Sequence, residues 1–212
     1  GVMVAPGYPS GRETRVEAVS LTSAVAGERS DFRVYVRDAF GHGNTLPPGL
    51  LARISGNPSA AVVLRNLPGA LVQEHTEHTV LGTYTPTVAG NHTLLLTYLA
   101  SNISTIPIRV LPGGASAPKC RSEGLGVIQA TAGRVATFVV SARDVFGNDI
   151  TRGGATFVVN LDGARSHLRG KCVDGGMGTY VCSYAPTTSL SALLSVTTGR
   201  VHVMGSPFVI AV

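Results

Sequence analysis

The sequence of 212 residues lacks tryptophan and is poor in charge, with charged residues making up only 14% of it. None of its apolar runs approaches the roughly 18 residues that a membrane-spanning helix requires. Long helices are excluded as well, because 26 glycines and 12 prolines destabilise helix interiors. Disorder is excluded in turn, since 44% of the residues are apolar and regularly spaced. The composition therefore predicts a folded chain rich in β-structure.

An internal repeat organises the chain. Residues 32–41 (FRVYVRDAFG) recur 106 positions later as residues 138–147 (FVVSARDVFG). Residues 84–87 (YTPT) recur 100 positions later as residues 184–187 (YAPT). The chain thus contains two tandem copies of about one hundred residues each, the usual size of an immunoglobulin-like sandwich. Such a duplication favours a spacer or a binding surface over a catalytic pocket.

Alternating apolar residues predict strands in both copies. Phe32, Val34 and Val36 alternate with polar residues, which is typical of a strand with one buried face. Further strands are predicted at residues 51–54, 61–64, 93–99 and 106–110 of the first copy, and at residues 155–161, 166–172, 192–196 and 207–212 of the second. Seven short strands per copy predict an all-β chain of two tandem seven-stranded β-sandwiches.

The repeat also predicts the domain boundaries. The first domain is expected at residues 14–111, a short linker of Pro, Gly, Ala and Ser at residues 112–118, and the second domain at residues 119–212. Residues 1–13 are expected to be a linker or the end of a preceding repeat, because Pro6-Gly7 recurs as Pro112-Gly113. The chain begins without methionine or a signal peptide, so we expect it to be part of a longer array.

Three motifs of the second copy form a specific set, namely residues 138–148 (FVVSARDVFGN), 173–180 (VDGGMGTY) and 205–208 (GSPF). Together they make residues 118–212 similar to a filamin-type immunoglobulin repeat. The first copy matches less well, because it lacks the Gly-Gly before its third strand and the Asp-rich turn. The resemblance implies strands A, B, E and D in one sheet and strands C, F and G in the other.

The resemblance also implies a binding site. Filamin-type repeats bind partners by adding a peptide strand to the exposed edge of strand C, beside strand D. The corresponding edges are residues 155–161 with 165–171 in the second copy, and residues 51–54 with 61–65 in the first. The predicted partner is a protein or an acidic glycan.

Every second residue of the predicted strand D in the second copy is basic, which would give a positive stripe on its outward face. With two residues of strand C, the predicted partner-binding residues are Arg165, His167, Arg169, Lys171, Phe157 and Val159. The alternative is a solvated edge strand whose charges prevent aggregation.

All three cysteines lie in the second copy. Cys172 and Cys182 are predicted on neighbouring antiparallel strands, where opposed Cα atoms come close enough for a disulfide. We predict this pair, which would indicate an oxidising compartment. The alternative is three buried reduced thiols. Cys120 is left over and is either free or paired with a segment outside this chain.

Two glycosylation sequons point to the same compartment. Asn91-His92-Thr93 and Asn102-Ile103-Ser104 fall at predicted turns of the first copy, where a glycan would face solvent. We therefore predict glycosylation of Asn91 and Asn102 and an extracellular location.

No catalytic, metal or cofactor site is predicted. Residues 74–78 (EHTEH) invite comparison with zinc sites, but His75 and His78 are three positions apart and the helical zinc motif needs four. No nucleophile elbow or phosphate-binding loop occurs. Asp38 and Asp144 recur where a strand enters a turn, so we expect them to bond the turn backbone, with Asn44 or Asn148 closing the turn.

These features predict a non-catalytic adhesion or assembly module in the ectodomain of a larger membrane protein, anchored outside this chain. The repeats are similar to those in ectodomains of plant and green-algal gamete attachment proteins, which implies gamete recognition. No nucleic-acid partner is expected, because the net charge of +5 is modest and the sequence has neither basic clusters with stacking aromatics nor a known nucleic-acid-binding module. The alternative is an intracellular cytoskeletal or ciliary scaffold with reduced cysteines. A third possibility is a domain that flanks an enzyme.

Overall fold

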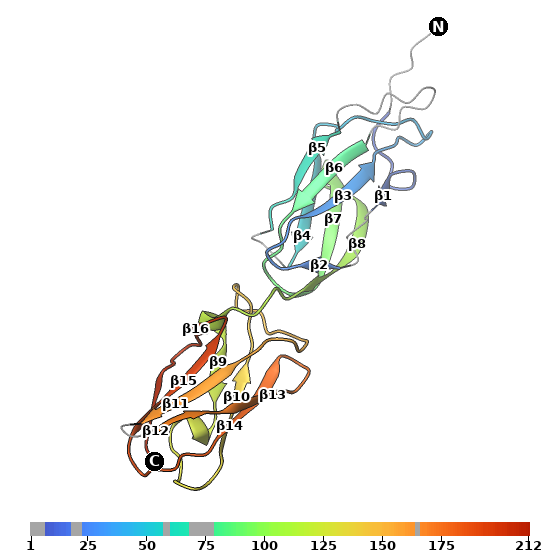
Figure 1. Cartoon of the computed structure of the whole chain (residues 1–212). Helices are drawn as coiled ribbons and strands as arrows, with labels where there is room; N and C mark the ends of the chain where they lie inside the picture. The colour runs from blue at the N-terminus through green and yellow to red at the C-terminus, as the bar shows by residue number, and fades with distance from the viewer. Residues whose placement is uncertain (1–6, 18–22, 57–59, 68–78, 164–165) are drawn as a thin grey trace. The chain divides into compact units, whose positions relative to one another are not determined.

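The computed structural model describes residues 7–17, 23–56, 60–67, 79–163 and 166–212. The chain divides into two compact units, Gly1–Leu111 (unit 1) and Pro112–Val212 (unit 2). Each unit is a sandwich of two β-sheets (Figure 1). The predicted fold class is confirmed: the chain is all-β and forms two tandem immunoglobulin-like sandwiches.

Unit 1 forms two four-stranded sheets from its described residues. The strands are β1 (Arg15–Glu17), β2 (Ala24–Val25), β3 (Ser30–Tyr35), β4 (Leu50–Ser55), β5 (Val63–Asn66), β6 (Thr79–Tyr84), β7 (Gly90–Tyr98) and β8 (Ser101–Leu111). One sheet has the order β1-β3-β6-β5 and the other β2-β8-β7-β4. Neighbouring strands are antiparallel except β2, which runs parallel to the end of β8.

Unit 2 follows the same plan with one additional strand. Its strands are β9 (Arg121–Glu123), β10 (Ala136–Ser141), β11 (Val158–Gly163), β12 (Ser166–Arg169), β13 (Lys171–Asp174), β14 (Thr179–Tyr184), β15 (Ala192–Thr198), β16 (Val201–His202) and β17 (Phe208–Ile210). One sheet has the order β13-β14-β10-β9, which is the predicted D-E-B-A arrangement. The other has the order β12-β11-β15-β16, and β17 also pairs with β15.

The alternation seen in the sequence defines the cores. Phe32, Val34 and Val36 are at most 2% exposed, and their counterparts in unit 2 are equally buried. The buried apolar residues form two clusters, one within each unit. Each sandwich is therefore held together by side chains that face inward from both of its sheets.

A buried aspartate ties the start of unit 1 to the turn after β3. Asp38 is 2% exposed, and one carboxylate oxygen accepts hydrogen bonds from the backbone N–H groups of Phe40 and His42, both at 2.9 Å. The other oxygen accepts a hydrogen bond from the N–H of Gly7 at 2.8 Å and lies 3.1 Å from Nδ1 of His42. The bond from Gly7 and those from the turn hold the pKa of Asp38 well below its usual range, although burial opposes them. Asn44 donates to the carbonyl of Gly7 at 2.8 Å.

Unit 2 repeats this anchor 106 positions later. The carboxylate of Asp144 is 1% exposed and accepts hydrogen bonds from the backbone N–H groups of Phe146 and Asn148 at 2.9 Å and of Gly113 at 3.0 Å. The Asn148 side chain donates to it at 2.7 Å, in the position that His42 takes in unit 1. Gly113 belongs to the predicted linker of residues 112–118, so part of that segment is bonded to unit 2.

The prediction of a single strand over residues 166–172 was wrong. The structure divides this segment at Gly170 into β12 and β13, which belong to different sheets. The N–H of Gly170 donates to the carbonyl of Val159 at 2.9 Å. A Cβ atom on residue 170 would lie 2.7 Å from the carbonyl oxygen of Ser183 and 2.8 Å from Cγ1 of Val159. The chain crosses between the sheets at this point because only glycine fits there.

Replacing Gly170 by alanine is expected to destabilise unit 2 by about 1–3 kcal/mol, because the added carbon overlaps two packed neighbours. Urea denaturation would measure the change. Gly114→Ala is the matched control, since a Cβ atom there meets nothing within 4 Å, and its midpoint should not move. Equal midpoints for both variants would mean that the crossover tolerates a side chain.

Replacing Asp38 by asparagine is expected to destabilise unit 1 at neutral pH, because an amide NH₂ would face N–H donors that now meet a carboxylate oxygen. The folded-state pKa of Asp38 lies below its unfolded value, so its stabilisation is present above about pH 4 and is lost as the pH falls further. Thermal unfolding should therefore separate the two proteins most at neutral pH, and the gap should close in acid. Asp31→Asn, at an exposed ion pair, should show little gap at any pH.

Candidate functional site

The outer edge of β4 in unit 1 is open. All six residues of β4 pair with β7, and within the described part of unit 1 no strand pairs with its other side. β5 follows β4 in sequence but pairs with β6 in the opposite sheet. This edge corresponds to the predicted binding edge of residues 51–54. Leu51 and Arg53 are both exposed on it, Leu51 by 66%.

Alternate backbone groups of β4 face the open side. The N–H of Leu99 donates to the carbonyl of Gly49 at 3.3 Å, so the bonded positions of this antiparallel ladder are Gly49 and every second residue after it. The backbone groups of Ala52 and Ile54 therefore point away from β7. An extended peptide can hydrogen-bond to such groups and lengthen the sheet by one strand.

The equivalent edge in unit 2 is already occupied. β12 pairs antiparallel with β11 from Asn160 to Gly163, and β11 begins at Val158 rather than at residue 155. Phe157 and Val159, predicted to contact a partner, are only 6% and 1% exposed. The Phe157 ring packs 4.8 Å from that of Tyr180, centroid to centroid. The predicted exposed edge of the second copy is thus corrected: β12 covers it, and the two apolar side chains belong to the core.

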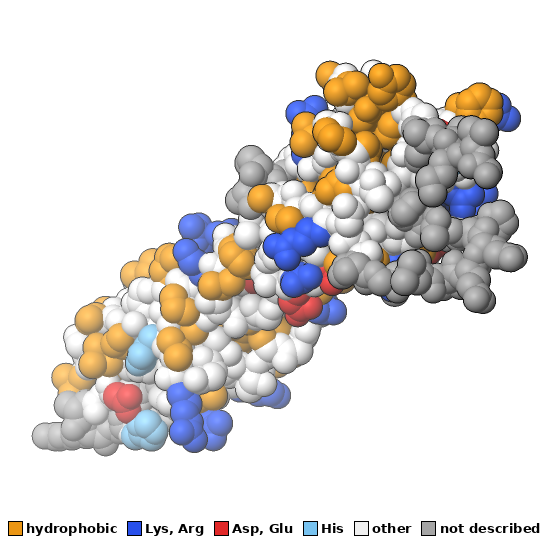
Figure 2. Space-filling model, turned by 90° about the horizontal axis from the view of Figure 1, so that it is seen from above, with side chains coloured by type: hydrophobic (Ala, Val, Ile, Leu, Met, Phe, Trp, Pro, Cys, Tyr) orange, Lys and Arg blue, Asp and Glu red, His pale blue; other side chains and the backbone are white. Residues whose placement is uncertain are grey.

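The predicted basic stripe is not a single feature. Arg165 lies outside the described residues. His167 on β12 is paired with the carboxylate of Asp162 on β11. Arg169 is exposed on β12, whereas Lys171 is exposed on β13, across the turn at Gly170. On the face shown in Figure 2, Lys and Arg side chains form small separate groups. Arg169 and Lys171 therefore lie on different sheets.

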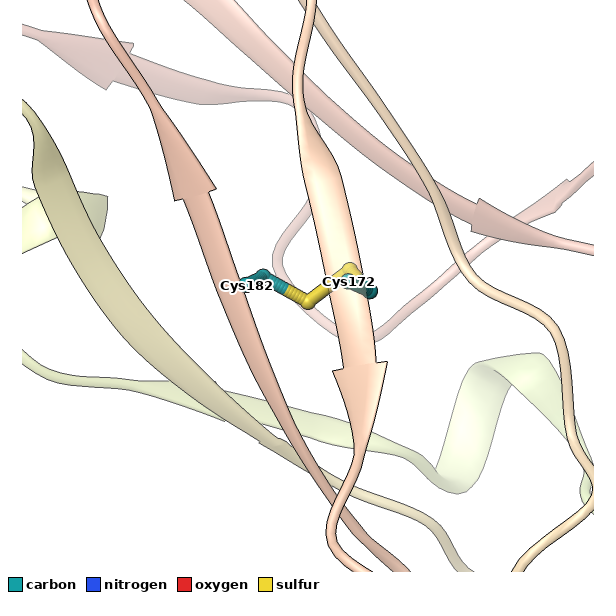
Figure 3. The surroundings of a disulfide bond; sticks show 2 residues. All are labelled: Cys172 and Cys182. Atoms are coloured by element: carbon teal, nitrogen blue, oxygen red, sulfur yellow. A yellow bond between two sulfur atoms is a disulfide. The ribbon is translucent and has the colours of Figure 1, made fainter.

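The predicted disulfide is present. Cys172 on β13 and Cys182 on β14 are directly opposed, with Cα atoms 4.0 Å apart, and their sulfur atoms are bonded (Figure 3). In unit 1 the corresponding pair is Leu64 and Gly82. The Phe32 ring lies over Gly82, where a Cβ atom would be 2.1 Å from the ring. Phe138 of unit 2 is opposed to Cys182 in the same way, so the two units differ in the pair itself, which is Leu64 with Gly82 in unit 1 and a disulfide in unit 2.

Cys120 is a free, fully buried thiol. It is 0% exposed, and its Sγ donates to the carbonyl of Ser116 at 3.2 Å. Burial raises the pKa of this thiol, so it stays protonated at neutral pH. Within this chain the thiol is free, and pairing with a segment outside it stays an untested alternative.

Both sequon asparagines lie on the same outer face of unit 1. Asn91 is opposed to Arg109 and Asn102 to Thr97 in the β7–β8 ladder, and directly opposed residues share a face. The face is the outer one, because His92 next to Asn91 points inward and is 8% exposed. Asn102 follows the β7–β8 turn as expected, whereas Asn91 is the second residue of β7. Glycosylation of both residues stays a prediction.

Other candidate chemistry does not converge on a site. His75 and His78 lie outside the described residues. Elsewhere in the described ranges, no three His, Cys, Asp or Glu side chains come together as metal ligands. No helix in the described part of the chain has the length and apolar character needed to cross a membrane.

Sequence reasoning missed the hairpin formed by β11 and β12. Its signal was Asp162-Gly163, a turn-forming dipeptide that ends an apolar run, with Gly163 opposed to Ser166. The alternation of basic residues continues through Gly170, which made the two strands look like one. Only the pairing partners separate them.

Two stacked sheets with mostly antiparallel pairing define each unit as an immunoglobulin-like domain. Residues 114–209 match the family model described as Filamin/ABP280 repeat. Unit 2 is therefore similar to a filamin-type repeat over nearly its whole length.

Curated relatives match only part of the chain. The E3 ubiquitin-protein ligase TRIM71 of Rattus norvegicus is 38% identical over 100 residues, which is 47% of this chain and 12% of that protein. The Mus musculus protein of the same name is 36% identical over 106 residues, covering 50% and 12% respectively. The matched part is thus a small fraction of each relative.

A solved structure extends the likeness to both units. The Escherichia coli adhesin FdeC matches over 97% of this chain and 66% of its own, with a TM-score of 0.61 and 16% identity. At that identity the likeness shows a shared fold alone.

Reducing the disulfide is expected to destabilise unit 2 by about 2–3 kcal/mol, because the bond closes a loop with a sequence separation of 10 and restricts the unfolded chain. Urea denaturation with and without dithiothreitol would measure this. Unit 1 contains no cysteine and serves as the internal control, so peptides from it should exchange hydrogen at unchanged rates. If reduction leaves unit 2 equally stable, the bond is not a structural brace.

Proposed function

We propose that the chain is a non-catalytic binding module of an extracellular adhesion or assembly protein, and that a partner adds a β-strand to the open edge of β4 in unit 1. One observation carries this proposal. Among the described residues of unit 1, no strand pairs with the outward backbone groups of Ala52 and Ile54, whereas β12 pairs with the equivalent strand in unit 2. Strand addition supplies affinity through main-chain hydrogen bonds to such outward groups.

The side chains of β4 indicate the chemistry of the partner. Leu51 and Arg53 project on the same side and are exposed. A matching peptide is extended, with an apolar residue opposite Leu51 and an acidic residue opposite Arg53. Its backbone would pair with Ala52 and Ile54. Selectivity then comes from alternate side chains, as in other strand-addition complexes.

The extracellular location is supported by the Cys172–Cys182 disulfide and by the two exposed sequon asparagines. The shared fold of the adhesin FdeC is compatible with this location. Gamete recognition, an anchor in a membrane protein and a cytoplasmic scaffold with reduced thiols stay predictions. Glycan on Asn91 or Asn102 of native material would support the first two against the third.

Replacing Ala52 by proline is expected to weaken binding of an added strand at least about tenfold, because proline removes an outward N–H donor without breaking the ladder to β7. The probe is an extended peptide selected from a random library against the intact chain. Its affinity for each variant would be measured by isothermal titration calorimetry.

Two variants make this experiment specific. Ala52→Ser keeps the N–H group and should bind like the original chain. A double variant with Arg169→Glu and Lys171→Glu tests the basic residues of unit 2 and should also bind normally. Loss of binding in this double variant, with binding kept in Ala52→Pro, would move the site to unit 2 and overturn the proposal.

A further inference from the structure

A shallow hollow lies at one end of unit 1, between residues 8–11 and the hairpin that joins β7 to β8. It encloses about 360 Å³ and is lined in part by Tyr8, Tyr98, Leu99 and Asn102. The two tyrosine rings lie 6.2 Å apart, centroid to centroid. Tyr8 is 79% exposed and Leu99 is 66% exposed, so the hollow has apolar walls that face solvent.

The hairpin turn that places Leu99 beside the hollow has a backbone conformation that is sterically unfavourable for residues other than glycine. Leu99 and Ala100 have φ values of 45° and 68°, in the left-handed region that non-glycine residues rarely occupy. In unit 2 the first of the two equivalent positions is Gly199, which adopts the same region with φ 57° at no steric cost. The second position is Arg200 with φ 67°, so both hairpins use the same kind of turn. The turn of unit 1 differs in presenting an exposed apolar side chain, Leu99, next to the hollow.

Asn102 lies on the rim of the hollow, so a group attached to its side chain can cover the apolar walls. Its side chain is exposed and belongs to the sequon completed by Ser104. Its Nδ2 donates to Oγ1 of Thr105 at 2.9 Å, which uses one of the two amide hydrogens. The other hydrogen can be replaced by a sugar while this bond is kept. A sugar attached here starts at the hollow, so it meets the apolar walls at high effective concentration.

We propose that Asn102 carries an N-linked glycan whose first sugar packs in the hollow against Tyr8, Tyr98 and Leu99. This inference rests on the proposed extracellular function. One face of an N-acetylglucosamine ring carries C–H groups that pack on aromatic and leucine side chains, while its hydroxyls stay in water. The glycan thereby fastens residues 8–11 to the β7–β8 hairpin.

The attachment uses a lipid-linked oligosaccharide diphosphate as donor. Nδ2 of Asn102 forms a bond to C1 of the first sugar and loses one hydrogen as a proton. The C1–O bond to the diphosphate breaks, and the diphosphate leaves with the electron pair. No oxidation or reduction takes place.

The test uses the whole chain, secreted from eukaryotic cells that attach high-mannose glycans and then trimmed to one N-acetylglucosamine per site. Tandem mass spectrometry of peptides establishes which asparagines are modified. Asn102→Gln is expected to lower the unfolding temperature of unit 1 by about 4 °C. Asn91→Gln is the matched control, because no apolar hollow surrounds that residue among the described ones, and should cause a smaller shift.

A double-mutant cycle identifies the contact. In a Tyr8→Ala background, removal of the Asn102 glycan should no longer lower the unfolding temperature, because the Tyr8 ring against which the sugar packs is missing. Tyr8 is 79% exposed, so this variant is expected to fold. Leu99→Gly should likewise abolish the effect, and it should raise the stability of the unglycosylated chain by relieving the turn. Cross-relaxation in NMR between the sugar acetyl protons and the tyrosine rings gives a second readout.

Several outcomes would overturn the inference. If Asn102 is bare while Asn91 is modified, the hollow has another occupant and the extracellular proposal stands. If neither asparagine carries a glycan, the proposed extracellular location is contradicted as well. If Asn102 is modified but the cycle shows no coupling and no cross-relaxation appears, the sugar does not sit in the hollow. Peptide binding at β4 is measured independently, so its failure is distinguishable from each of these results.

Discussion

The carboxylates of Asp38 and Asp144 are the interaction on which each unit depends. Each one gathers two N–H groups of the following turn and one from the segment that enters the unit. A buried charge is tolerated at this point because three or more donors replace the water that it loses. The anchor fixes the turn after one strand and the start of the domain with a single side chain. Its recurrence at an interval of 106 positions explains why residues around it are the best-matched part of the repeat.

The two units share this anchor but differ in how other parts of the sandwich are built. Between the D and E strands, unit 2 joins Cys172 to Cys182, whereas unit 1 has Leu64 opposed to Gly82. In both units a buried phenylalanine, Phe32 or Phe138, is directly opposed to the second member of the pair. The last strand also differs, since β8 runs unbroken from Ser101 to Leu111 while unit 2 interrupts its counterpart between β16 and β17. Duplication thus preserved the sandwich and left its edges free to diverge.

The two units differ in the backbone groups that their sheet edges offer to a partner. In unit 2 the extra strand β12 pairs with Asn160–Gly163 of β11, so β12 replaces this part of β11 as the edge of the sheet. In unit 1 the outer backbone of β4 has no such cover in the described residues. Asn91 and Asn102 lie on the outer face of the same sheet, so glycans there would leave its edge and the opposite sheet for protein contacts. Under the proposed function, unit 2 is a braced spacer and unit 1 is the binding unit.

The sequence by itself determined the fold, because alternation with a period of two and the repeated turn residues specify strands, faces and their order. It also located the cysteine pair, since Cys172 and Cys182 share inward parity on adjacent strands. Which edge is open could not be determined in this way. The split at Gly170 depends on crowding by Ser183 and Val159, which are distant in sequence and meet only in the folded sandwich. The hollow beside Asn102 likewise requires residues 8–11 to meet the β7–β8 hairpin. Local patterns set strands and faces, whereas edges and hollows arise from contacts between distant segments, which only the tertiary structure decides.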